Sequence, residues 1–152
     1  MEQNAIATET STSYAEQAWA HVKNLLEQEP ASHNHLNDVL RLLAKYRSRL
    51  IQNTVLKIHG VRVQSGPFAG LEFLEESAEG CHVPKLLGGY ERELHGIIKA
   101  AIDSDYSDIV NIGCAEGYYA VGLARRCPTA RVHAFDSNPN AQRACSELSA
   151  RN

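Results

Sequence analysis

Two glycines and a small residue between them form the most distinctive short segment of the chain, NIGCAEGYYA at residues 111–120. Gly113 allows the backbone to turn sharply after an apolar run, and Gly117 allows it to approach a ligand or the following helix without a Cβ in the way. Ala115 keeps the bend thin. N–H groups at the start of a helix point into such a bend and favour a carboxylate or a phosphate. The segment therefore predicts a binding loop.

Asp136 is the second residue with a predicted binding role. It lies 23 residues beyond Gly113 and directly follows the segment RVHAF, residues 131–135. In doubly wound α/β proteins an acid at the end of the second strand binds the ribose hydroxyls of a nucleotide. The bend and the acid together favour a cofactor that contains a nucleoside.

The elements that would position these residues follow from the apolar pattern. We expect a short buried strand at IVNI, residues 109–112, a helix at 118–126, and a second strand at 131–135. Another helix should open at Pro139, with Asn138 as its N-cap. Strand, glycine turn, helix, strand, acid and helix is the first crossover of a doubly wound parallel sheet.

The spacing of the glycines indicates which class of cofactor the loop would bind. A dinucleotide fingerprint would need glycines at positions 115 and 118, where the chain has Ala115 and Tyr118. The observed GCAEG resembles the first motif of class I S-adenosylmethionine-dependent methyltransferases, D/E-x-G-x-G-x-G. This resemblance implies that the loop wraps the methionine end of S-adenosyl-L-methionine and that Asp136 binds its ribose. The implied cofactor-binding residues are Asn111, Gly113, Cys114, Ala115, Glu116, Gly117, Tyr118, Asp136 and Ser137.

A longer segment ahead of the bend, GPFAGLEFLEESAEGCHVPKLLGGYERELHGII, looks like the region that precedes the cofactor fold in FkbM-type methyltransferases. The resemblance implies methyl transfer to a small-molecule or sugar-containing acceptor and not to nucleic acid. Two residues depart from the family pattern. Asn111 replaces the usual acid and loses its negative charge, and Ala115 replaces the middle glycine, adding one methyl group that we expect to be tolerated.

No residue of the chain stands out as a base that would activate the acceptor, so the catalytic residues stay unknown. A methyltransferase sheet of this class normally continues well past the second strand, whereas this sequence stops at SARN. We therefore expect the chain to be the N-terminal portion of a longer Rossmann-like enzyme, with an incomplete sheet and no activity by itself.

The first 60 residues have a different pattern. Residues 1–12 are predicted to be a disordered tail, and residues 13–60 a helical hairpin arm. Ser13 and Glu16 form a capping box for a first helix that ends by Pro30. A second helix should run from Asn34 to Gly60, with Leu36, Val39, Leu43, Tyr46 and Leu50 along one stripe. The first helix is acidic and the second basic. The stripe fits either a homodimer through residues 13–60 or a hairpin packed against its own domain.

Residues 61–104 are expected to contain a small β-hairpin, at 61–82, and a helix ahead of the binding loop. Pro84 is expected at a first helical position, and Gly88 and Gly89 should break the helix. The stretch after the break is expected to place Leu94, Ile97, Ile98, Ala101 and Ile102 on one face. Glu91 is predicted either to cap this helix or to line a ligand pocket.

Composition excludes several classes of function. The net charge of −3 gives no field that would attract nucleic acid or an anionic membrane, and no apolar run reaches the length of a membrane helix. The four cysteines form no C-x-x-C pair, so we expect no metal site and a cytoplasmic protein with reduced thiols.

Two other classes of function remain open on the sequence. One is another nucleotide-binding Rossmann enzyme, such as a nicotinamide dehydrogenase. The other is a non-catalytic interaction module in which the helical arm is the functional part and the α/β segment is a remnant.

Overall fold

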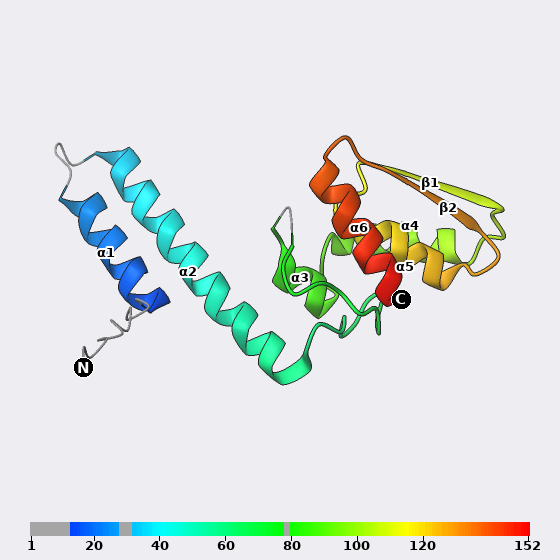
Figure 1. Ribbon diagram of the computed structural model, residues 1–152, viewed down its shortest axis with the longest axis horizontal. Coiled ribbons are helices and arrows are strands. Elements are labelled where there is room, and N and C mark those ends of the chain that lie inside the picture. The colour runs from blue at the N-terminus through cyan, green and yellow to red at the C-terminus, as the bar shows by residue number, and fades with distance from the viewer. Residues whose placement is uncertain (1–12, 28–31, 78–79) are drawn as a thin grey trace, which may run out of the picture. The chain divides into compact units, whose positions relative to one another are not determined.

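The computed structural model describes residues 13–27, 32–77 and 80–152. The chain has a mixed α and β architecture and divides into two compact units, with the boundary between Leu50 and Ile51. The elements, in chain order (Figure 1), are α1 (Tyr14–Leu26), α2 (His33–His59), α3 (His82–Leu87), the 3₁₀ helix η1 (Arg92–Leu94), α4 (His95–Ile102), β1 (Asp108–Ile112), α5 (Tyr118–Arg126), β2 (Arg131–Phe135) and α6 (Pro139–Arg151).

The first unit is an antiparallel pair formed by α1 and the first part of α2 (Figure 1). The predicted capping box is confirmed, because Ser13 Oγ accepts from the Glu16 N–H at 3.2 Å and Glu16 Oε2 accepts from the Ser13 N–H at 2.7 Å. The ring of Tyr14 stacks on Tyr46 at 5.3 Å. The predicted tail 1–12 and the predicted helix end at Pro30 lie outside the described residues.

The predicted second helix is also confirmed, and Gly60 follows its last residue with a φ of 64°. The predicted stripe is only partly on the covered side of α2. Val39 and Tyr46 are half-buried, whereas the three leucines of the stripe are exposed: Leu36, Leu43 and Leu50. The stripe is wider than one hairpin partner can cover.

The β-hairpin expected at residues 61–82 is present only as one antiparallel bridge, between Arg62 and Glu72. It extends no further because the Leu71 N–H, which would continue the pairing to Val63, donates to the Phe68 carbonyl at 3.0 Å. A turn inside the segment thus takes the hydrogen bond that a longer hairpin would need, which the alternation of its residues does not reveal.

The double-glycine break is confirmed, because α3 ends at Gly88, whose φ is 77°. A Cβ at Gly88 would lie 1.9 Å from the Ser65 carbonyl oxygen, so the two segments touch backbone to backbone. Pro84, expected at the first helical position, is the third residue of α3. The single apolar face predicted for residues 94–102 is divided: Ile98 and Ile102 pack on the core, while Leu94 and Ile97 are exposed.

The segment from β1 to α6 follows the predicted order, and its boundaries match the prediction except that β1 begins one residue earlier, at Asp108. The strands are parallel, with Ile109 opposite Val132 and Ile112 opposite Phe135. Asn138 caps α6 by accepting the Asn140 N–H at 2.9 Å. The predicted α/β class therefore agrees with the structure, although the described residues contain two strands and not a complete doubly wound sheet.

One core holds the second unit together. One face of the sheet, represented by Ile109 and Val132, packs on this core, and the opposite face leaves Val110, Ile112 and Phe135 exposed. The buried core residues are Val55, Val63, Phe68, Leu71, Phe73, Leu74, Leu86, Tyr118, Val121, Leu123 and Leu148. The core fixes α3 and α5, the elements on both sides of the predicted binding loop.

Candidate binding loop after the first strand

The loop between β1 and α5 is a tight bend that is anchored to the end of β2. The N–H groups of Gly113 and Cys114 both donate to the Phe135 carbonyl, at 2.8 and 2.9 Å. The Gly117 N–H then donates to the Cys114 carbonyl at 2.8 Å and closes the turn. The bend therefore lies at the carboxyl end of both strands, the edge at which open α/β sheets bind ligands.

The two glycines are required for different reasons. Gly113 has a φ of 73°, and a Cβ on it would meet nothing within 4 Å, so there is open space above the bend. Gly117 has a φ of 91°, and a Cβ on it would lie 2.7 Å from Cys145 Sγ of α6. Gly117 thus serves packing of the helix behind the bend, while the space at Gly113 is available to a ligand.

Ala115 also adopts a left-handed conformation, with a φ of 48°. For a residue with a Cβ this conformation costs roughly 1 kcal/mol relative to glycine. The expectation that its extra methyl group is harmless considered only volume, and the backbone conformation adds a strain that the sequence did not indicate.

Asp136 lies directly against the bend. Its Oδ2 accepts from the Ala115 N–H at 2.9 Å and its Oδ1 accepts from the Asn138 N–H at 2.8 Å. These hydrogen bonds, the one from Asn138 first, hold the pKa of the Asp136 carboxyl below its usual value. The structure therefore brings Asp136 and the bend together, with the carboxylate charged.

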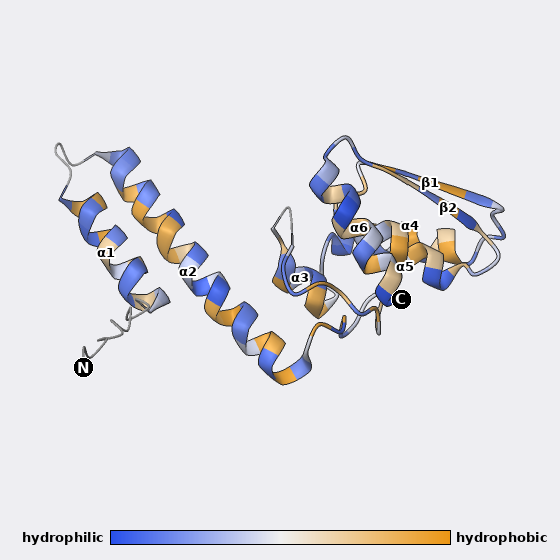
Figure 2. Ribbon diagram, viewed as in Figure 1, coloured by the Kyte–Doolittle hydropathy of each residue, from blue (hydrophilic) through white to orange (hydrophobic). Residues whose placement is uncertain are grey.

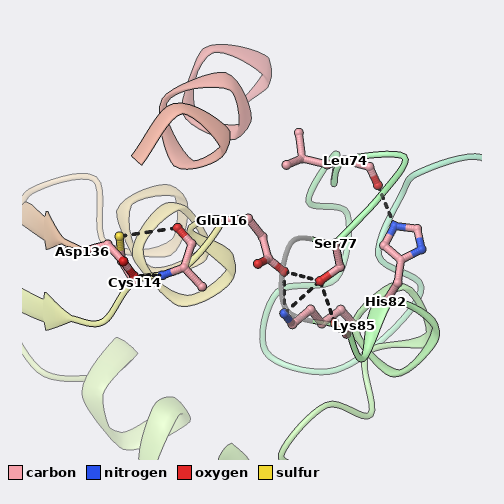
Figure 3. Close-up of polar contacts among 9 residues, drawn as sticks. Leu74, Ser77, His82, Lys85, Cys114, Glu116 and Asp136 are labelled. Atoms are coloured by element: carbon pink, nitrogen blue, oxygen red, sulfur yellow. Dashed lines mark hydrogen bonds and ion pairs between the residues drawn. The ribbon is translucent and has the colours of Figure 1, made fainter. Parts of the chain in front are cut away.

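The Glu116 side chain does not belong to the ligand side of the bend, which corrects its predicted role. It is fully buried, and Glu116 Oε1 lies 2.5 Å from Lys85 Nζ and 2.7 Å from Ser77 Oγ. Figure 3 shows this carboxylate directed toward α3 and away from Asp136. Burial raises the pKa of Glu116, but the hydrogen bonds from Lys85 and Ser77 outweigh it and the net pKa is lowered.

Cys114 and Tyr118 were also predicted to contact the cofactor, and the structure turns both side chains inward. Cys114 is buried, and burial, followed by the nearby Cys145, raises its pKa to about 11. The Tyr118 ring packs edge-on against Phe68 and Phe73. Only the backbone of Cys114 remains for a ligand, and the Tyr118 ring belongs to the core.

Asn111 and Ser137 complete the predicted set. Asn111 is the fourth residue of β1, and its Oδ1 is buried and accepts no hydrogen bond within the described part of the chain. Ser137 is exposed beside Asp136. The side of the bend that is open to a ligand is therefore formed by Gly113, Ala115, Asp136 and Ser137.

Sequence reasoning missed two contacts around the bend. Lys85 was assigned no role, because nothing in the sequence links it to a glutamate 31 residues later. Glu91 was predicted to cap a helix or to line a pocket; its side chain makes no capping hydrogen bond and instead accepts from the Tyr119 hydroxyl at 2.6 Å. Burial and the Glu91 carboxylate raise the Tyr119 pKa.

No protein-family model, curated protein or solved structure matches this chain. In residues 13–27, 32–77 and 80–152, no group of three or more His, Cys, Asp or Glu side chains is placed to hold a metal ion. None of the helices in that part of the chain is both long enough and apolar enough to cross a membrane.

Proposed function

We propose that the protein is a class I methyltransferase that binds S-adenosyl-L-methionine on the bend at residues 113–117 and Asp136. The hydrogen bond from the Ala115 N–H to the Asp136 carboxylate carries this proposal, because it joins the bend and the acid in one site at the carboxyl edge of two parallel strands. The motif GCAEG and the position of the acid supply the cofactor class.

The residues present fit such a ligand. The space above Gly113 admits a group that lies close to the backbone, and the Asp136 carboxylate is an acceptor of the kind that ribose hydroxyls need. Among the described residues no donor reaches Asn111 Oδ1, and the amino group of the cofactor is a donor of the right kind.

S-adenosylmethionine supplies a methyl group on a positively charged sulfur. The residues of this chain would bind and orient the cofactor, and we assign none of them to deprotonate the acceptor. By resemblance, the acceptor is a small molecule or a sugar-containing metabolite. All four cysteines are free thiols, in agreement with the cytoplasmic location that we propose.

Calorimetric titration of the 152-residue chain with S-adenosylmethionine, and separately with NAD, tests the proposal. We expect Asp136→Asn to weaken S-adenosylmethionine binding by about tenfold or more, because hydrogen bonds to a charged group contribute about 1.5–3 kcal/mol. The amide oxygen of Asn can still accept the Ala115 N–H, so the bend is retained.

Asp108→Asn is the matched control. Asp108 begins β1, at the opposite edge of the sheet, and pairs with His133 at 3.0 Å, so its substitution removes the same charge away from the bend. It should leave the affinity unchanged. A folded chain that binds no S-adenosylmethionine, that prefers NAD, or that binds equally well after both substitutions contradicts the proposal.

A further inference from the structure

Among the exposed large apolar side chains of the α1–α2 hairpin, five form a set that is called the hairpin face here. Their exposed fractions run from 46% at Leu43 to 67% at Trp19. On α1, Trp19 and Leu26 are seven residues apart, and on α2 so are Leu36 and Leu43, with Leu40 between them. Seven-residue spacing keeps side chains on one stripe of a helix. The hairpin face consists of Trp19, Leu26, Leu36, Leu40 and Leu43.

The two stripes lie on the same side of the hairpin. Val22 of α1 is buried and Val39 of α2 is half-buried, so these two residues mark the sides on which the helices face each other. On each helix, two residues of the hairpin face lie three residues before and four residues after the valine. At 3.6 residues per turn, these positions are rotated about the helix axis by roughly 40–60° from the valine, in the same sense on both helices. Because the helices are antiparallel, equal rotations bring both stripes to one face. Figure 2 shows apolar positions recurring along both helices.

The two helices bury too little apolar surface between them to be stable while the hairpin face stays exposed to water. Within residues 13–27 and 32–50, Val22 is the only side chain that is buried. A short helix pair gains its stability from burying apolar surface against a neighbour and not from helix propensity. A second layer must therefore cover the hairpin face.

We infer that the hairpin face is covered by the same face of a second copy, as a four-helix bundle. The charges of α1 and α2 favour a second copy as the partner and determine how that copy is oriented. α1 and its C-cap residue carry Glu16, Lys23 and Glu27, a net charge of −1, whereas α2 up to Leu50 carries Asp38, Arg41, Lys45, Arg47 and Arg49, a net charge of +3. A two-fold axis parallel to the helices places α1 of each copy over α2 of the other, so acidic helices lie on basic ones. The perpendicular axis would place α2 on α2 and oppose like charges.

This arrangement makes every neighbouring pair of helices antiparallel, as in up-and-down bundles. Arg47 lies seven residues after Leu40, at the margin of the hairpin face, and no carboxylate in the described part of the chain pairs with it. In the bundle it faces the acidic α1 of the second copy. The inference does not depend on S-adenosylmethionine binding.

Sedimentation equilibrium of the 152-residue chain over a range of concentrations tests the dimer, and Trp19, the only tryptophan, supplies an independent signal. We expect a dimer whose dissociation is accompanied by a red shift of Trp19 emission, as the indole becomes hydrated. Leu43→Asp should raise the dissociation constant at least roughly a hundredfold, because the substitution occurs twice in each dimer.

Two controls make the result specific. Ser48→Asp adds the same charge on the outward side of α2, nine residues or about two and a half turns from Val39, and should leave the dissociation constant unchanged. Ile112→Lys alters the exposed face of β1 and should also leave it unchanged. Circular dichroism of each variant shows that the helices persist.

Arg47→Glu tests the orientation of the bundle. It should weaken the dimer, and the loss should shrink at high salt. Tighter association after Arg47→Glu would place α2 against α2 and overturn the orientation. A chain that stays monomeric, a dimer that survives Leu43→Asp, or a dimer that Ile112→Lys abolishes would each overturn the inference.

Discussion

Lys85 Nζ lies 2.5 Å from Glu116 Oε1, and both side chains are buried. The contact joins α3 to the bend after β1, two segments that are separated by 31 residues in the chain. Ser77 and the ring of Tyr90, whose centroid is 4.8 Å from Lys85 Nζ, complete the surroundings. The conformation of the bend is therefore set partly by a charge pair behind it.

Lys85→Met should destabilise the protein by about 3–5 kcal/mol, because it leaves the buried Glu116 carboxylate without a cation. The double variant Lys85→Met/Glu116→Leu should recover most of that loss, since Ser77 keeps the Gly80 carbonyl as a hydrogen-bond acceptor. Urea unfolding at pH 7 measures both. Arg62→Met, which breaks the exposed pair with Glu72, should cost less than about 1 kcal/mol. Equal losses in the free energy of unfolding from Lys85→Met and Arg62→Met would show that the buried pair stabilises the protein no more than the exposed pair does.

The same pair predicts an acid sensitivity. The pKa of Glu116 is lowered in the folded protein, so the stability that its charge contributes is complete above the unfolded value of about 4.3. It is lost as the pH falls through the lower folded pKa. The free energy of unfolding of the unmodified chain, measured relative to Lys85→Met/Glu116→Leu, should therefore decrease below about pH 4.3. A constant difference between pH 6 and the acid limit of folding would contradict the assignment.

Three substitutions in the bend should differ in sign and size. Ala115→Gly should stabilise the protein by about 1 kcal/mol, because it relieves a left-handed conformation. Gly113→Ala should destabilise it through backbone strain alone, and Gly117→Ala should do so more strongly, because its Cβ would also collide with Cys145. Thermal unfolding in the absence of ligand ranks the three variants. If Gly117→Ala cost no more than Gly113→Ala, the contact with α6 would not constrain the bend.

The neighbouring tyrosines Tyr118 and Tyr119 form a matched pair for testing their hydroxyl groups. Tyr119→Phe removes the donor to Glu91 and should cost about 1–2 kcal/mol. Tyr118→Phe removes a buried hydroxyl that has no partner in the described residues, so it should be neutral or stabilising. Chemical denaturation of both variants compares them. A larger loss from Tyr118→Phe would mean that its hydroxyl has a partner.

Local signals were sufficient to predict the elements around the bend. The ends of α5 and β2 match the prediction because a glycine, a proline and an N-capping asparagine mark them in the sequence. Asp136 could also be assigned to the bend, since the end of a strand and the loop of its parallel neighbour must share one edge of the sheet.

The direction of side chains within the bend could not be predicted in this way. Glu116 and Tyr118 turn inward because α3 and the core lie behind them, and these neighbours are distant in sequence. The hairpin at residues 61–82 is cut short for a local reason, because the Leu71 N–H that would extend the strand pairing donates to the Phe68 carbonyl instead. Methyl transfer and the second copy stay predictions until the experiments above are done.

The close contact at Gly88 has a mechanical consequence. A Cβ on Gly66 would lie 2.5 Å from the Gly88 carbonyl oxygen, just as one on Gly88 would meet Ser65, so the two segments interlock through paired glycines. The Ser65 hydroxyl adds a hydrogen bond to the Leu87 carbonyl at 2.6 Å across the same contact. Lys85 lies three residues before Gly88, so this backbone contact also restrains the position of Lys85. Gly66 and Gly88, which do not touch the bend, therefore contribute to its rigidity.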